Sequence, residues 1–291
     1  MTTAPSSGRP STSAPTSGRS STTAPEGLTL PRGGTTIFPT YRLVGYAGYP
    51  GSSALGRLGV GDLDARIREM EGMAEPYAHG RKILPVLELI ATVVHPDPGA
   101  DGTYRSRIDN DVIKTYLAAA RRHKALLLLN IQPGRADFLD EAKAYQKWLE
   151  QPDVGLALDP EWAVGPGQKP GTVFGSTTGA ELDSVAAWTS RLVAAHHLPQ
   201  KVIVYHQLHV SIVKKAGGLK QHPGIAMVAS VDGIGNAAEK ISTWKKVVAV
   251  KPSFVHPGFK LFFGEDRQHG SLMTAGQVMA LKPTPEYVLY E

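Results

Sequence analysis

Residues 154–161 read VGLALDPE, a short apolar run that ends in two carboxylates separated by a proline. Alternation along a strand places Gly155, Ala157, Asp159 and Glu161 on one face and the two leucines on the other. Pro160 cannot donate a ladder hydrogen bond, so we expect the strand to end there. Small residues followed by two acids favour an inner strand of a parallel barrel, with both acids at the C-terminal mouth.

From residue 41 onward, short apolar runs alternate with longer helical patterns, as in parallel α/β proteins. Eight strands are expected, at Arg42–Ala47, Ile83–Leu89, Leu126–Ile131, Val154–Asp159, Lys201–His206, Ile225–Val231, Phe259–Phe263 and Tyr287–Glu291. Helical patterns cover Leu63–Ala78, Asn110–His123, Phe138–Glu150, Ala180–His197, Asn236–Val248 and Ser271–Ala280. The crossover around Val210–Leu219 is weak because Gly217 and Gly218 interrupt it.

Eight strands with helical crossovers fill about 250 residues, which predicts a single (β/α)8 barrel (TIM barrel) over residues 28–291. An open doubly wound sheet is the alternative. It would require a Gly-rich phosphate loop leading into a helix after the first strand, and the glycines at 45, 48 and 51 are not followed directly by one.

Residues 1–27 consist mainly of Ser, Thr, Ala, Pro and Gly, with no Leu, Ile, Val or aromatic residue. Such a segment has nothing to bury, so we expect a disordered hydrophilic linker. Linkers of this kind commonly join an export signal or anchor to an extracellular domain. We therefore expect a secreted or cell-surface protein, with a disordered cytosolic tail as the alternative. No signal peptide is expected within the chain as given, and no membrane span, since no run of about 18 apolar residues occurs.

The 291 residues carry a net charge of +5 and include no cysteine. The lack of cysteine excludes disulfides, thiol catalysis and Cys-bound zinc. No stripe of basic residues interleaved with exposed aromatics occurs, so nucleic acid is not expected as a partner. We expect a monomer that uses no cofactor or metal.

Polar side chains close several of the other expected strands. Together with Trp162, which follows Glu161, they form the expected binding set: Tyr46, Glu88, Asn130, Gln132, His206, Asp232 and Glu291. Each alone is more simply a helix cap or turn residue, and Asp232, before Gly233 and a helix, is an example. Their convergence at one end of a barrel favours a binding site.

Paired carboxylates with neighbouring aromatic, amide and imidazole groups indicate a carbohydrate site. Cleavage of a glycosidic bond requires a protonated acid and a second carboxylate. We expect Glu161 to be the acid, with its pKa raised by the charge of Asp159.

Asp159-Pro-Glu161 resembles the D-x-E that ends the chitinase-type glycoside hydrolase signature D-x-x-D-x-D-x-E. Val154 and Ala157 stand where that signature has Asp, so the resemblance does not imply a substrate-assisted mechanism or an acetamido-sugar preference. Many retaining glycosidase barrels carry the acid after strand four and the nucleophile after strand seven, which would make Glu265 the nucleophile. The domain also resembles uncharacterised secreted bacterial barrel proteins.

Two other classes of function remain open. A metal-dependent hydrolase could use His206, His209 and His256 with Asp159, Glu161 and Glu88 as ligands, although no H-E-x-x-H motif occurs. A non-catalytic barrel that binds a glycan or a protein partner is the second alternative.

Overall fold

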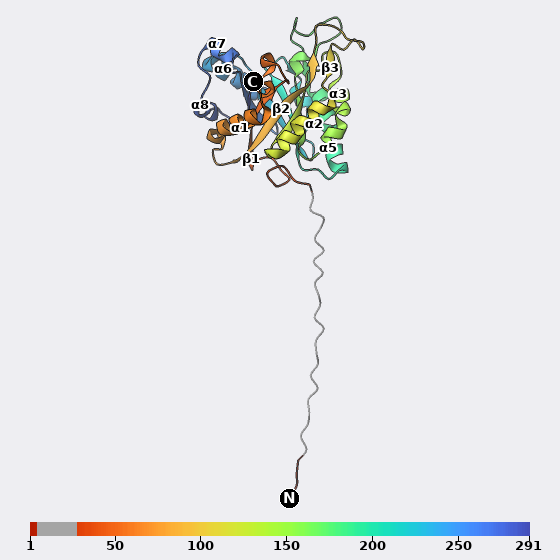
Figure 1. The fold of residues 1–291 in the computed structure, drawn as a ribbon, viewed down its shortest axis with the longest axis vertical. Coiled ribbons are helices and arrows are strands. Elements are labelled where there is room, and N and C mark those ends of the chain that lie inside the picture. Colours follow the sequence, from red (N-terminus) through yellow and green to blue (C-terminus); the bar gives the residue numbers. More distant parts are fainter. Residues whose placement is uncertain (5–27) are drawn as a thin grey trace.

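The computed structural model describes residues 1–4 and 28–291, so the linker predicted for residues 1–27 lies largely outside the described residues. From residue 41 onward the chain forms a closed barrel of eight parallel strands surrounded by helices (Figure 1). This confirms the predicted fold. None of the helices in the described part is both long and apolar enough to cross a bilayer.

The barrel closes because the first strand pairs in parallel with both the second and the last. The barrel strands are β1 (Tyr41–Gly48), β2 (Lys82–Val94), β4 (Leu126–Ile131), β5 (Val154–Leu158), β7 (Lys201–Gln207), β9 (Ile225–Val231), β10 (His256–Leu261) and β11 (Tyr287–Tyr290). Each of the eight expected strands is found.

Helices cover the outside of the barrel: α1 (Leu63–Ala74), α2 (Asn110–Arg122), α3 (Phe138–Ala144), α4 (Gln146–Leu149), α5 (Gly179–Ala195), α6 (Ala237–Val250), α7 (Glu265–His269) and α8 (Ala275–Met279). Outward-facing strand residues pack against them, as where Trp244 of α6 meets Phe259 of β10 with ring centroids 5.6 Å apart.

Besides the apolar core between the strands and the helices, inward-facing residues of the strands form a second apolar cluster inside the barrel. This inner cluster includes Leu84, Leu128 and Val204. Leu30 and Ile37, from the segment before β1, join this cluster and close the N-terminal end. Gly155 has no side chain because a Cβ there would lie 2.6 Å from the Val202 carbonyl oxygen. These residues therefore fill the lower part of the barrel interior, and a cavity lies toward the C-terminal mouth.

The structure differs from the sequence-based expectation at several elements, among them two strands and one crossover. β10 begins at His256, three residues earlier than expected. Pro257 has no amide hydrogen to donate, but its carbonyl oxygen accepts a hydrogen bond from the Glu286 amide, so the proline is tolerated near the beginning of the strand. β2 continues to Val94 and pairs with a short antiparallel strand, β3 (Arg105–Arg107). Between β7 and β9 the chain forms the short strand β8 (Val213–Lys214) and a 3-10 turn instead of a helix; β8 pairs with β6 (Thr177–Thr178).

Candidate active site at the barrel mouth

A cavity of about 520 Å³ opens at the C-terminal end of the barrel. Residues at or just beyond the end of every barrel strand line it: Ala47, Glu88, Ile90, Asn130, Gln132, Asp159, Leu208, Asp232, Lys260, Phe262 and Glu291. Because all eight strands of a parallel barrel end at the same face, polar groups far apart in the sequence meet here.

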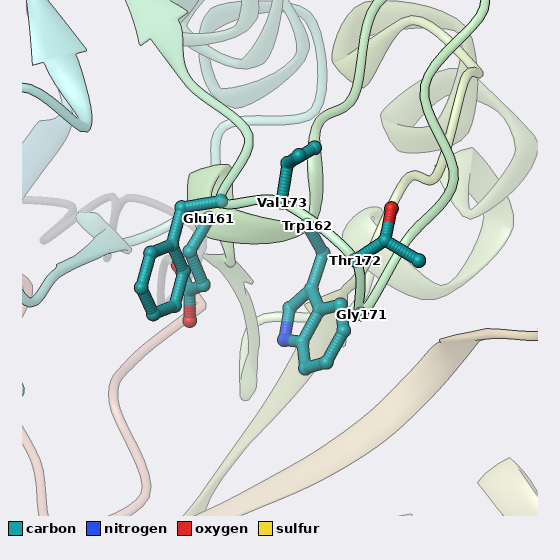
Figure 2. Close-up of a pocket in the computed structure, with 6 residues that line it drawn as sticks. Glu161, Trp162, Gly171, Thr172 and Val173 are labelled. Atoms are coloured by element: carbon teal, nitrogen blue, oxygen red, sulfur yellow. The ribbon is translucent and has the colours of Figure 1, made fainter.

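The end of β5 supplies the two acids expected from the sequence. Asp159 follows the last residue of the strand, and Pro160–Trp162 form a 3-10 turn that carries Glu161 and Trp162 over the cavity. Figure 2 shows both side chains pointing to the same side of the chain, with Gly171–Val173 of the following loop beside the indole. Trp162, Glu161 and Phe174 line both the main cavity and an adjoining hollow of about 240 Å³.

His206, at the end of β7, is fully buried beneath the cavity between carboxylates from three other strands. Its Nδ1 lies 2.7 Å from Asp232 Oδ2, while Nε2 lies 2.9 Å from Glu88 Oε1 and 3.8 Å from Asp159 Oδ1. Asn130 donates from Nδ2 to Glu88 at 3.0 Å and to Asp159 at 2.9 Å. The imidazole and the amide thus fix three carboxyl groups relative to one another.

Lys260 of β10 is the second cation of the site. Its ammonium group lies 2.5 Å from Glu291 Oε2 and 3.3 Å from Asp232 Oδ2, and only 7% of its side chain is exposed. Burial lowers the pKa of Lys260, but the charges of Glu291 and Asp232 outweigh burial and leave it well above the usual range. Lys260 therefore remains a fixed positive charge in the cavity wall.

The two acids after β5 are both held toward the protonated form. Burial, followed by the charges of Asp159 and Asp232, raises the pKa of Glu161 well above its ordinary value. Although the residue is partly exposed, its carboxyl oxygen Oε2 is enclosed and has no hydrogen-bond partner among the described residues. Burial also raises the pKa of Asp159, to about 6, although His206 and Lys260 oppose it.

The pKa values of Glu88 and Asp232 are instead lowered. Burial alone would raise the pKa of each carboxyl group, but the positive charges of His206 and Lys260 lower both overall. Burial disfavours the imidazolium form of His206, yet Asp232 and Glu88 raise its pKa well above the ordinary value. The site therefore combines Glu161, whose pKa is raised, with carboxyl groups whose pKa is lowered, which is the combination that acid–base chemistry requires.

Most residues of the expected set meet at this cavity. Those that line it are Glu88, Asn130, Gln132, Asp159, Glu161, Trp162, Asp232 and Glu291, with His206 directly below. Asp232 is not the cap of the next helix. That role belongs to Asn236, whose side chain accepts from the amides of Ala238 and Glu239.

Two residues of the expected set do not lie in the cavity. Tyr46 faces outward from β1, fully buried against α1, where its hydroxyl contacts Glu69 and Met73. Its neighbours Gly45 and Ala47 face inward, so alternation excludes Tyr46 from the interior. Glu265 is exposed at the start of α7 and lines a surface hollow that shares Ala54 and Glu291 with the main cavity but is not itself part of the cavity wall. Glu265 does not line the main cavity with Glu161, and its role as nucleophile stays a prediction.

Lys260 and Tyr287 are residues of the candidate site that the sequence reasoning missed. Tyr287 donates from its hydroxyl to Glu88 inside the barrel. Because Tyr287 lies four residues before Glu291, strict alternation along β11 would have placed it on the same inward face. No residue of β10 had been singled out, so alternation did not identify Lys260.

The histidines of the metal alternative do not converge. His256 begins β10 at the N-terminal end, where its ring stacks on Phe38 and contacts Glu286. His209 is bound to Ser211 on the surface. Among residues 1–4 and 28–291, no group of three or more His, Asp and Glu side chains has a geometry suited to a metal ion.

No protein-family model matches this chain, and no curated protein is similar to it.

Proposed function

We propose that this chain is a glycoside hydrolase that acts on a polysaccharide or cell-wall glycan. The observation that carries the proposal is the contrast between Glu161 at the barrel mouth, whose pKa is raised well above its ordinary value, and the carboxylates paired with Lys260 and His206 in the same cavity. Glycosidases require a protonated acid together with a second, ionised carboxylate.

Glu161 would donate its proton to the glycosidic oxygen as the bond from that oxygen to the anomeric carbon breaks. Trp162 and Phe174 flank this acid, and the Phe174 side chain is exposed at the rim. Aromatic faces of this kind suit the apolar faces of sugar rings. The hollow of about 240 Å³ on the far side of Glu161 gives space for the leaving group.

Glu291 is the best placed second carboxylate. It lines the cavity, keeps 21% of its side chain exposed, and is bound to Lys260 through one oxygen. Asp232 is less suited, since Ser230 occupies one of its oxygens and His206 and Lys260 the other. We therefore assign to Glu291, in place of Glu265, the role of nucleophile or of base toward water.

The test is hydrolysis of a panel of polysaccharides by the wild type and by Glu161→Gln. General acid catalysis contributes about 100-fold or more, so the variant should lose at least that factor in kcat while it still folds and binds sugar. Wild-type activity should also fall as the pH rises through the elevated pKa of Glu161, because the acid loses its proton.

Glu265→Gln is the matched control, since it removes an exposed carboxylate outside the cavity and should keep full activity. Full hydrolytic activity of the Glu161→Gln variant would show that Glu161 is not the catalytic acid. Binding of a glycan without cleavage by the wild type would instead identify a glycan-binding barrel.

We also propose that the protein works outside the cell, because the Ser/Thr/Pro-rich composition of residues 1–27 is typical of linkers in exported proteins. Fractionation of cells that carry the natural gene tests this: recovery from the medium or cell surface supports it, and recovery from the cytosol alone contradicts it.

A further inference from the structure

The cavity carries more negative than positive charge. Its wall contains five carboxyl groups, from Glu88, Asp159, Glu161, Asp232 and Glu291, and one lysine. His206, below the wall, adds a second cation. Even when Glu161 is protonated, carboxylates outnumber cations by two to one at neutral pH, and both cations are already paired with them. A ligand that enters the cavity therefore meets a negative potential.

A second observation concerns hydrogen bonding. Asn130 is 2% exposed and lines the cavity, and its NH₂ group is directed to Glu88 and Asp159, which fixes the orientation of the amide. Its carbonyl oxygen has no hydrogen-bond partner among the described residues. Glu161 Oε2 is enclosed and unpartnered in the same way. The free position on Asn130 is an acceptor, so it calls for a ligand that donates a hydrogen bond.

We propose that the site selects a saccharide with a free, protonated amino group, that is, an amino sugar that is not acetylated. This inference rests on the proposed function and names its substrate class. An ammonium group has three donors and no acceptor, so it satisfies Asn130 Oδ1 and offsets the excess of carboxylates. A uronic acid would add another carboxylate to the cavity, and a neutral sugar would leave the negative charge uncompensated.

The charge of the whole molecule does not account for this preference. The chain is basic, with a net charge of +5, so its overall field favours anions. Fields from distant surface charges are screened within about 8–10 Å at ordinary ionic strength, whereas the cavity carboxylates lie within contact distance of a bound ligand. The local charge therefore decides the selectivity.

The experiment measures calorimetric binding to the Glu161→Gln protein, in which an uncharged amide replaces the protonated acid and cleavage is blocked. The probes are tetramers of β-1,4-linked glucosamine, N-acetylglucosamine, glucose and glucuronic acid. The glucosamine tetramer should bind at least about tenfold more tightly than the other three. Raising the ionic strength from about 0.1 to about 1 M, which shortens the Debye length from about 10 to about 3 Å, should weaken that binding several-fold and leave the glucose tetramer unaffected.

A second variant, Glu161→Gln with Asp159→Asn, removes the negative charge of Asp159 and should reduce the preference for the amino sugar. If that variant does not fold, the salt dependence of the first still decides. Equal or tighter binding of the acetylated, neutral or acidic tetramer overturns the inference, and so does binding of none of the four. Selective binding of the glucosamine tetramer, without cleavage of any glycoside by the wild type, supports the inference and contradicts the proposed hydrolase.

Discussion

At the scale of single residues, Asp159 links the ion pairs inside the barrel to the acid at its mouth. It receives a hydrogen bond from Asn130 at 2.9 Å, lies 3.8 Å from His206, and raises the pKa of Glu161 two residues later. Its own pKa is raised to about 6, mainly by burial. A buried carboxyl group whose pKa is raised on folding makes stability depend on pH.

Asp159→Asn should remove part of this pH dependence. In the unfolded chain Asp159 loses its proton near its ordinary pKa, whereas in the folded chain it keeps the proton until about pH 6. Asp159 therefore stabilises the folded state most at low pH, and this stabilisation is lost as the pH rises from the ordinary pKa to about 6. The unfolding free energy of the wild type should therefore fall relative to that of the variant by about 2 kcal/mol between about pH 4 and pH 6. Urea denaturation at several pH values measures this.

The matched control for that substitution is Asp140→Asn on α3, which removes an exposed carboxylate from an ion pair with Lys143. It should change the unfolding free energy by less than about 0.5 kcal/mol. A difference between wild type and Asp159→Asn that stays constant from pH 4 to pH 6 would contradict the assignment of a raised pKa to Asp159.

Alternation along single strands could predict the faces of Asp159 and Glu161, because a residue's face depends only on its local register. The same rule, applied strictly, would have rejected Tyr46, which sits between inward-facing Gly45 and Ala47. Lys260 was missed because it lies within the apolar run FKLFF, where a charged residue is compatible with either face. Its role depends on Asp232 and Glu291, which reach it only through tertiary pairing.

At the scale of elements, the start of α6 decides how the cavity loop after β9 is held. The Asn236 side chain accepts hydrogen bonds from the amides of Ala238 and Glu239. The Glu239 carboxylate in turn accepts from the Asn236 amide, so both hydrogen bonds of the capping box are formed. Just before it, the amide of Gly235 donates to Asp266, which also accepts from Phe262 and pairs with Lys240. The loops after β9 and β10 are thereby tied together beside the cavity.

Asn236→Ala should destabilise the protein by about 1 kcal/mol, because the first turn of α6 loses its side-chain acceptor. Asn236→Asp keeps an acceptor oxygen at a helix N-terminus and should remain within about 0.5 kcal/mol of the wild type. Urea denaturation measures both. Equal destabilisation by the two substitutions would mean that the Asn236 side chain stabilises the protein through a contact other than the helix cap.

Helices and strands with strong periodicity were predictable, and elements that depend on pairing were not. The crossover between β7 and β9 has no helix because Gly217 and Gly218 interrupt its pattern, and that weakness was visible in the sequence. The pairing of β8 with β6 was not visible, since two-residue strands have no periodicity of their own. Likewise, β10 ends before Phe262 because the Phe262 amide donates to the side chain of Asp266, a contact that local propensity does not encode.

At the scale of the whole molecule, closure of the barrel is what brings the site together. β11 bonds to β1 on one side and β10 on the other, and it places Tyr287 against Glu88 and Glu291 against Lys260. The number and order of strands predicted that closure. The chemistry of the site is harder to predict, because the charge of the cavity depends on which carboxylates are paired, and pairing is a property of the closed barrel.

Deletion of residues 287–291 should therefore abolish cooperative folding. Without β11, the hydrogen-bonding edges of β1 and β10 are left open, and an open edge within a buried parallel sheet leaves backbone groups unpaired. We expect loss of the near-UV circular dichroism signal and binding of a hydrophobic dye. Tyr287→Phe is the control: it keeps the strand, loses only the hydroxyl bond to Glu88, and should stay folded with a loss of about 1–3 kcal/mol. A truncated chain that still unfolds in one cooperative transition would show that the other seven strands hold the cavity by themselves, and that β11 contributes Glu291 to the site without being needed for the fold.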